Sequence, residues 1–160
     1  MSVTSAEERD VRRVEELYFD YAQAIDEEVE RWPDLFTADA RYRVTSRENF
    51  DRRLPLAAIY CEGRGMIVDR AMAVRKTTVY AKRFMRHTIT NVRVNDPGDG
   101  NLSAGANFAI YETFEDTITR LFAVGRYIDT IVRSGDALLF REKLCVLDSN
   151  LVIGSLIYPI

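Results

Sequence analysis

Four long stretches in the second half of the chain have the residue pattern of β-strands, and short turns separate them. They span residues 86–95, 102–115, 117–133 and 137–148. The first stretch alternates strictly, which predicts two faces: His87, Ile89, Asn91 and Arg93 on one, and Thr88, Thr90, Val92 and Val94 on the other. Strands joined by short turns pair antiparallel, so this half of the chain predicts a long-stranded antiparallel sheet.

The first half of the chain has helical periodicity instead. Apolar side chains recur at three- and four-residue steps from Val11 to Val29, which predicts an amphipathic helix of about 24 residues. Pro33 disfavours helix at the preceding residue and can itself start a short helical turn. A second helix is predicted over residues 66–76, a strand over 40–46 and a loop over 47–54, whereas the apolar run 56–60 is of uncertain type.

Helices that precede an antiparallel sheet define an α+β domain. We expect the long helix to lie across the concave side of a curved sheet, which gives a cone with a pocket. At 160 residues the chain suits a single domain that covers residues 1–160.

The composition excludes several classes of protein. One histidine and two cysteines are too few for a Cys₂His₂ or His₃ zinc site, a Rieske cluster, or an iron site with two histidines and a carboxylate. The 22 lysines and arginines are outnumbered by 25 aspartates and glutamates, which argues against a nucleic-acid-binding protein. The acidic, polar first residues do not resemble a signal peptide, and no apolar run reaches the ~20 residues that span a membrane. We therefore expect a cytoplasmic protein with no nucleic-acid or membrane partner.

Three side chains could form an acid–base site if the fold brings them together. His87 could be a general base, but a structural histidine with a satisfied hydrogen bond is the favoured interpretation. Asp26 follows Ile25 near the end of the long helix, where a cone-shaped domain can place an acid in its pocket beside Tyr42 and His87. The acidic neighbours of Asp26 favour a solvated helix end instead.

The last ten residues, 151–160, are mostly apolar. Such a tail must be covered either by the core of its own chain or by a partner. Both possibilities remain open, and the second predicts that removing residues 156–160 weakens assembly more than it disturbs the helices.

An ordered set of short motifs carries a resemblance that covers nearly the whole chain. It comprises Ile25-Asp26, Arg31-Trp32-Pro33-Asp34-Leu35-Phe36, Tyr42-Arg43-Val44-Thr45, Arg47-Glu48-Asn49, Met66-Ile67, Asp69-Arg70, Val74-Arg75, Tyr80, Arg86-His87, Asn91-Val92, Phe108, Tyr111, Gly125-Arg126-Tyr127, Asp129, Leu138, Arg141 and Val146-Leu147-Asp148. The set resembles the small (β) subunits of aromatic-ring-hydroxylating dioxygenases. Among these it is most similar to subunits of enzymes that act on aromatic acids, such as terephthalate dioxygenase and salicylate 5-hydroxylase.

The resemblance implies an NTF2-like (cystatin-like) α+β cone and a larger α subunit as partner. The α subunit would hold the Rieske [2Fe–2S] cluster and the mononuclear Fe(II), commonly in an α3β3 assembly with contacts between β subunits. No catalytic, cofactor-binding or metal-binding residue is then expected on this chain. The candidates for scaffold or interface roles are Arg86, His87, Asp129, Arg141 and Asp148 at recurrent positions, together with Tyr158 and Ile160 of the tail.

Two functions are compatible with the sequence. The first is a non-catalytic β subunit that supports assembly of the α subunit in aromatic catabolism. The second is a free-standing NTF2-like dehydratase or isomerase that uses Asp26, Tyr42 and His87. An enzyme needs an open cavity with convergent polar groups, whereas eight tyrosines, eight phenylalanines and one tryptophan are available here to fill the cone. We therefore expect the first function.

Overall fold

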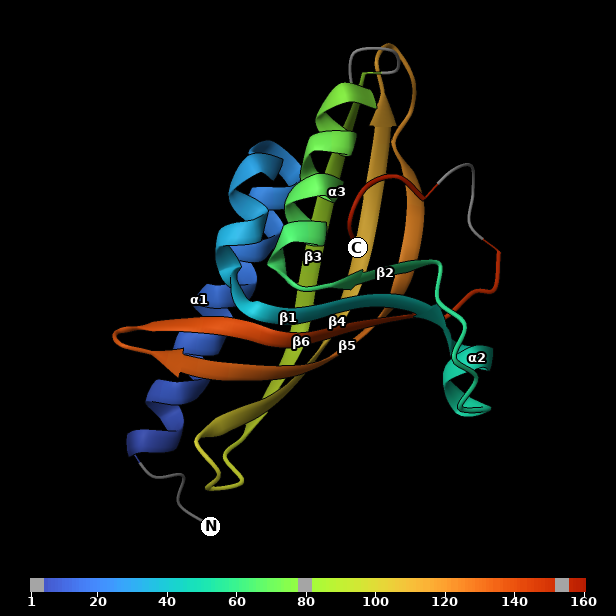
Figure 1. The fold of residues 1–160 in the computed structure, drawn as a ribbon. Coiled ribbons are helices and arrows are strands. Elements are labelled where there is room, and N and C mark those ends of the chain that lie inside the picture. Colours follow the sequence, from blue (N-terminus) through green and yellow to red (C-terminus); the bar gives the residue numbers. More distant parts are fainter. Residues whose placement is uncertain (1–4, 78–81, 152–155) are drawn as a thin grey trace.

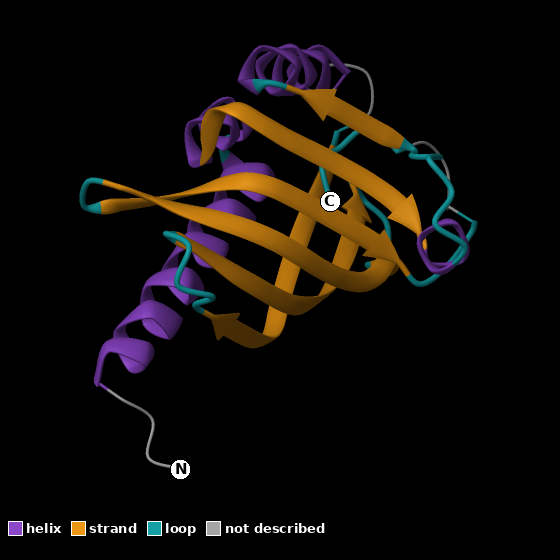
Figure 2. Cartoon of the chain, turned by 60° about the horizontal axis from the view of Figure 1, so that its bottom comes forward, coloured by secondary structure: helices purple, strands orange, loops and turns teal. Residues whose placement is uncertain are grey.

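The computed structural model describes residues 5–77, 82–151 and 156–160, and its six strands form one strongly curved sheet (Figures 1 and 2). The long helix α1 lies along the concave side and contacts β3 and β6, while α3 packs on η1, β1 and β2. Tyr80 and residues 152–155 lie outside the described residues. In chain order the elements are α1 (Ser5–Glu27), the 3₁₀-helix η1 (Val29–Leu35), β1 (Phe36–Ser46), α2 (Arg47–Asp51), β2 (Ile59–Glu62), α3 (Arg64–Thr77), β3 (Arg83–Asn95), β4 (Asn101–Phe114), β5 (Arg120–Ser134) and β6 (Ala137–Leu147).

The strand order in the sheet is β2-β1-β6-β5-β4-β3. The four long strands β3 to β6 pair antiparallel with their chain neighbours, as the short turns predicted. Strand β1 lies between β2 and β6 and runs parallel to β6, with Val44 opposite Cys145. The sheet is therefore mixed rather than purely antiparallel.

Strand β3 departs from the strict alternation expected for it. The pairing register with β4 shifts between Thr90 and Arg93, and Asn91 has a positive φ of 55°. This is a β-bulge, which asparagine accommodates more readily than most residues because it tolerates the left-handed region. The extra residue turns Val92 and Val94 toward the core, on the same side as Ile89. The prediction that these valines lie opposite His87 and Ile89 was wrong.

The first half differs from expectation mainly at element ends. Helix α1 stops at Glu27, and the segment around Pro33 forms the 3₁₀-helix η1. The predicted loop at 47–54 contains the short helix α2, which begins where the Ser46 side chain accepts a hydrogen bond from the Asn49 amide at 3.3 Å. Strand β1 starts at Phe36, four residues earlier than expected, and the uncertain run at 56–60 leads into β2.

Aromatic side chains occupy the concave side of the sheet. Tyr18 of α1 stacks on Tyr127 of β5 at 5.8 Å between ring centroids, and Tyr127 stacks on Phe108 of β4 at 4.5 Å. The tail joins this core, since Ile160 is fully buried and Tyr158 is 7% exposed. The core of its own chain therefore covers the end of the tail, which favours the first of the two possibilities considered for it.

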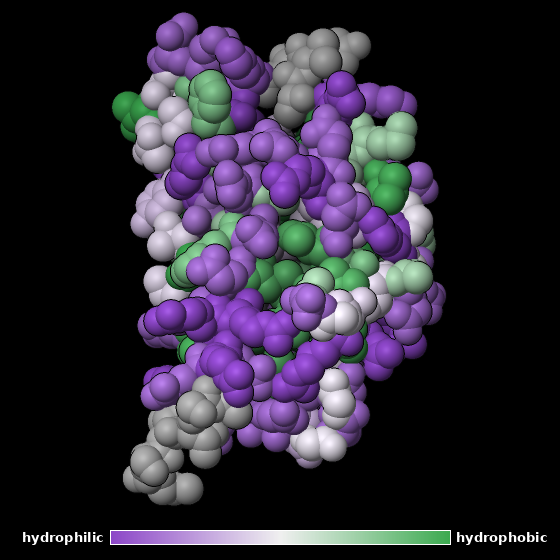
Figure 3. Space-filling model, turned by 90° about the vertical axis from the view of Figure 1, so that its left-hand side faces the viewer, coloured by the Kyte–Doolittle hydropathy of each residue, from purple (hydrophilic) through white to green (hydrophobic). Residues whose placement is uncertain are grey.

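The outward side of α1 is mostly polar, although Phe19 is exposed there. Glu8, Glu16, Asp20 and Glu27 are exposed there, and this side of the molecule is mostly hydrophilic (Figure 3). Within the described ranges, no helix is long and apolar enough to cross a membrane.

Candidate functional site

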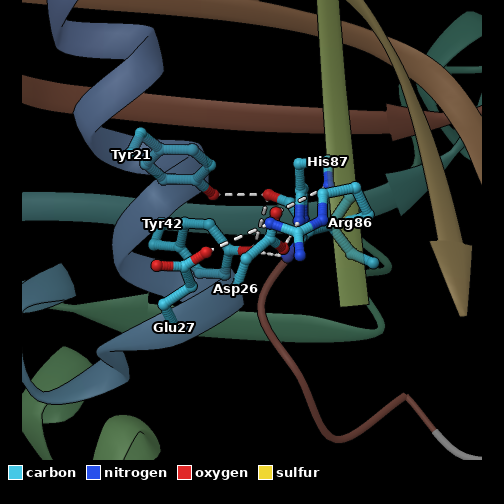
Figure 4. A network of polar contacts seen from close by, with 7 residues as sticks. Tyr21, Asp26, Glu27, Tyr42, Arg86 and His87 are labelled. Carbon is cyan, nitrogen blue, oxygen red and sulfur yellow. Dashed lines mark hydrogen bonds and ion pairs between the residues drawn. The ribbon is translucent and has the colours of Figure 1, made fainter. Parts of the chain in front are cut away.

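The end of α1 is joined to β3 by two adjacent pairs of side chains (Figure 4). The inner pair is Asp26 and His87. Asp26 Oδ1 lies 2.5 Å from His87 Nδ1, and Asp26 Oδ2 accepts a hydrogen bond from the His87 backbone amide at 2.8 Å. The outer pair is Arg86 and Glu27, with 3.2 Å between Arg86 Nη1 and Glu27 Oε1. Arg86 and His87 point to opposite faces of the strand, as neighbours on a strand must.

The interpretation of Asp26 as part of a solvated helix end was wrong. Its side chain is 4% exposed and that of His87 is fully buried, because the last turn of α1 packs on β3. Asp26 Oδ1 and His87 Nδ1 are within hydrogen-bond distance, and the tautomer of the imidazole ring sets which of the two atoms donates. His87 therefore has the satisfied hydrogen bond expected of a structural histidine. Its Nε2 atom is buried without a partner among the described residues.

Tyr21, Tyr42 and Cys145 converge on Ile160 next to this pair. The Tyr21 hydroxyl donates to the Ile160 carbonyl oxygen, and Cys145 Sγ donates to the same oxygen at 3.2 Å. The Ile160 amide donates to the Tyr42 hydroxyl at 2.7 Å, and the same hydroxyl lies 3.4 Å from the Ile160 carbonyl oxygen. Burial raises the pKa of Tyr21 and Tyr42 well above its usual range. Both hydroxyls therefore stay protonated and act as hydrogen-bond groups rather than as bases.

The three residues of the enzymatic interpretation thus lie in one region, yet each is already engaged. Both carboxylate oxygens of Asp26 bind His87, and the hydroxyl of Tyr42 binds Ile160. Figure 4 shows Tyr42 and Tyr21 beside the Asp26–His87 pair. The arrangement holds α1, β1 and β3 together.

A buried ion pair joins β5 to β6 on the concave side of the sheet. Lys143 Nζ lies 2.9 Å from Asp129 Oδ2, both side chains are fully buried, and the Tyr18 hydroxyl donates to the same carboxylate at 2.6 Å. The ammonium also sits 3.3 Å from the ring centroid of Tyr127. Burial raises the pKa of Asp129, against the opposing effect of the Lys143 charge. Sequence reasoning identified Asp129 but missed Lys143, although Lys143 shares the inward side of β6 with Cys145.

A third cluster anchors the tail at the far end of β3. Glu112 is fully buried and lies 2.7 Å from both Arg83 Nη1 and Arg120 Nη2. The Arg83 guanidinium carbon lies 4.5 Å from the ring centroid of Tyr158. Sequence reasoning missed this cluster because its partners come from three different strands.

The remaining candidates for scaffold or interface roles lie at the surface. Arg141 Nε is 3.8 Å from Asp39 Oδ2, and Asp148 Oδ1 is 2.6 Å from Arg47 Nη2. Exposed ion pairs of this kind add little stability. Among the described residues, no three His, Cys, Asp or Glu side chains gather closely enough to hold a metal ion.

Comparison with known proteins decides the family. Residues 21–153 match the model of the ring-hydroxylating β-subunit family. The chain belongs to this family. As a ring-hydroxylating β subunit, it is part of an oxidoreductase complex, and the dioxygenase resemblance of its motifs is confirmed.

Curated relatives of the β subunit come from dioxygenases. The chain is 30% identical to the small subunit of anthranilate 1,2-dioxygenase from Burkholderia cepacia over 132 residues, which is 82% of each chain. It is 28% identical to a β subunit of the terminal oxygenase component of terephthalate 1,2-dioxygenase from Comamonas sp, over 88% of this chain and 92% of the relative.

A solved structure supports the fold of the β subunit. A chain from Novosphingobium aromaticivorans, assigned as the β subunit of an aromatic-ring-hydroxylating dioxygenase, is 31% identical. It superposes with a TM-score of 0.87 over 98% of this chain and 100% of its own. The predicted NTF2-like α+β cone is confirmed.

Proposed function

We propose that this β subunit is a non-catalytic, structural part of the terminal oxygenase of a dioxygenase that acts on an aromatic acid. The family match over residues 21–153 carries the proposal. Two curated relatives support the substrate class, since anthranilate and terephthalate are both aromatic carboxylates. The substrate itself would be selected by the α subunit.

The residues of this chain do not fit either iron group of such an enzyme. Cys61 and Cys145 are both buried, Cys145 is hydrogen-bonded to Ile160, and burial raises the Cys145 pKa to about 12. The one histidine is held by Asp26. A Rieske cluster needs two thiolates and two imidazoles, so we assign the Rieske [2Fe–2S] cluster and the mononuclear Fe(II) to the α subunit.

We further propose a cytoplasmic α3β3 assembly with contacts between β subunits. Arg86, Arg141 and Asp148 are exposed or form surface ion pairs, so they are the candidates for contacts with neighbouring subunits. His87, Asp129, Tyr158 and Ile160 are buried, so they act as scaffold.

Co-expression with the cognate α subunit tests the assembly. We expect the two chains to purify together with Rieske-type absorbance and to hydroxylate an aromatic acid. Separate elution of the β subunit from an α subunit that is fully active alone would contradict the proposal.

The variant His87→Ala tests the non-catalytic role. The substitution leaves Asp26 Oδ1 buried without its partner, although the backbone amide at position 87 still donates to Oδ2, so it should lower stability by about 1–3 kcal/mol and reduce the yield of complex. Turnover per iron centre in the complex that does assemble should be nearly unchanged. Thr88→Ala, at the next position on the exposed face of β3, is the matched control for stability. A fall of ~10²–10⁴ in turnover, with iron content intact, would instead identify His87 as a general base.

A further inference from the structure

The way in which the tail is held resembles the binding of a ligand. Ile160 makes its hydrogen bonds to side chains of three core elements: Tyr21 of α1, Tyr42 of β1 and Cys145 of β6. Donors meet its carbonyl oxygen and an acceptor meets its amide, while its side chain is fully buried. Residues 156–160, called here the C-terminal segment, thus end in a site that recognises the backbone N–H, the carbonyl oxygen and the branched side chain of one residue.

A second contact makes the site specific for another side chain of the C-terminal segment, that of Tyr158. The ring of Tyr158 packs against the Arg83 guanidinium, which Glu112 holds in place at 2.7 Å. The tyrosine ring is 7% exposed. Two side chains of the segment, two residues apart, are therefore received by separate parts of the cone.

Unpartnered polar atoms also face the interior. His87 Nε2 and the Tyr127 hydroxyl are both buried and have no hydrogen-bond partner within the described part of the chain. Buried polar groups are normally paired, so unpaired ones are typical of a site that can receive a further polar group. The first of these atoms belongs to the Asp26–His87 pair, beside Tyr42 in Figure 4.

We propose that the concave side of this β subunit is a peptide-binding site whose resident ligand is its own C-terminal segment. The site takes a short apolar peptide whose last residue presents the same backbone N–H, carboxyl oxygen and branched side chain as Ile160. In the intact chain the tethered segment is present at an effective concentration of about millimolar. It therefore excludes free compounds and keeps His87 away from solvent.

The experiment uses a variant that lacks residues 156–160 and the synthetic pentapeptide Leu-Ile-Tyr-Pro-Ile as the probe. We expect the peptide to bind the shortened chain saturably and to raise its melting temperature, whereas the full-length chain should not bind it. Tyr42→Phe in the shortened chain removes one hydrogen bond and should weaken peptide binding by about 2- to 10-fold. Tyr60→Phe, at an exposed tyrosine, is the matched control and should leave the affinity unchanged.

Chemical modification of His87 gives a second measurement. The chain has one histidine, and peptide mass spectrometry can locate the group that diethylpyrocarbonate adds to it, so carbethoxylation mapped in this way reports on His87. We expect slow modification in the full-length chain, fast modification in the shortened chain, and slow modification again when the peptide is added.

Each result decides for or against the proposal. If the shortened chain does not fold alone, recovery of its circular dichroism on refolding with peptide supports the site, and no recovery at millimolar peptide overturns it. If the shortened chain folds, the absence of peptide binding overturns the proposal. Equal binding to the full-length chain, or equal loss of affinity in Tyr60→Phe, also overturns it.

Discussion

Replacing Lys143 with methionine should be among the most damaging single changes in this chain. The substitution keeps most of the side-chain volume but leaves the fully buried Asp129 carboxylate without its cation. Removing one partner of a buried ion pair typically costs ~3–5 kcal/mol. For a chain of this size each kcal/mol lowers the melting temperature by roughly 2–4 °C, so we expect a fall of roughly 6–20 °C.

The pH dependence of the Lys143→Met variant distinguishes loss of charge from loss of packing. Burial already raises the Asp129 pKa, and the Lys143 charge opposes that rise. Without Lys143 the folded-state pKa rises further above the unfolded value of ~3.9. The folded state then binds the proton more tightly, so the variant loses stability as pH increases from the unfolded pKa up to the folded one, by at most ~1.4 kcal/mol per pH unit. The variant should therefore be closest to the wild type in acid.

Urea unfolding of three variants completes the test. Adding Asp129→Asn to Lys143→Met removes both charges and should recover at least half of the lost free energy. Arg141→Met, which breaks an exposed pair with 3.8 Å between Arg141 Nε and Asp39 Oδ2, should change stability by no more than ~0.5 kcal/mol. The argument fails if Lys143→Met costs less than about 1 kcal/mol, or if its cost does not depend on pH.

Two further predictions concern other buried positions. Burial raises the pKa of Cys145 to about 12 and also raises the pKa of Cys61. Ellman's reagent should therefore label neither thiol in the native chain, and should label both at once in urea. Rapid labelling of Cys145 in the native chain would show that its site opens. Gly125→Ala should be strongly destabilising in thermal melts, because its methyl group would overlap the Val146 carbonyl oxygen and lie 2.8 Å from the Phe108 ring. Gly65→Ala in α3, with nothing within 4 Å, should be neutral or stabilising by up to ~1 kcal/mol, and equal effects at the two glycines would refute this account.

Local residue patterns were sufficient to predict the elements but not all of their partners. Helix α1 and strands β3 to β6 follow from periodicities that a short window contains. The parallel pairing of β1 with β6 joins residues about a hundred positions apart, such as Val44 and Cys145. Nothing near either strand specifies that pairing, so it depends on the closure of the whole sheet.

The bulge at Asn91 shows a second limit of pattern analysis. Strict alternation places Val92 and Val94 on the face opposite His87 and Ile89, whereas the structure packs all of the apolar residues among them against the core. The burial of two valines favours one extra residue in the strand, and the left-handed conformation of Asn91 supplies it. The sequence did contain a sign of the bulge. Strict alternation puts apolar residues on both faces of this strand, which is inconsistent with a sheet that is exposed on one side.

The residues of the candidate site were predicted from the sequence, but the burial of Asp26 was not. Asp26, Tyr42 and His87 were chosen together, and they do lie in one region. The neighbouring acids suggested that Asp26 is solvated, yet Glu27 and Glu28 are exposed while the Asp26 side chain is buried. The angle at which α1 crosses β3 decides which of two adjacent acids enters the core, and no local pattern encodes that angle.

The interior polar groups explain how a cone of this family can act as a scaffold. Asp26 binds His87, Asp129 binds Lys143 and Tyr18, and the Tyr21, Tyr42 and Cys145 side chains bind Ile160. A catalytic acid or base must direct a proton or lone pair at a substrate, whereas the Asp26, Asp129, Tyr21 and Tyr42 side chains direct theirs at other parts of the same chain. Every such bond also joins two elements: α1 to β3 and β5, β5 to β6, and the tail to α1, β1 and β6. Changes inside the cone should therefore reach a partner subunit through the shape and stability of the β subunit.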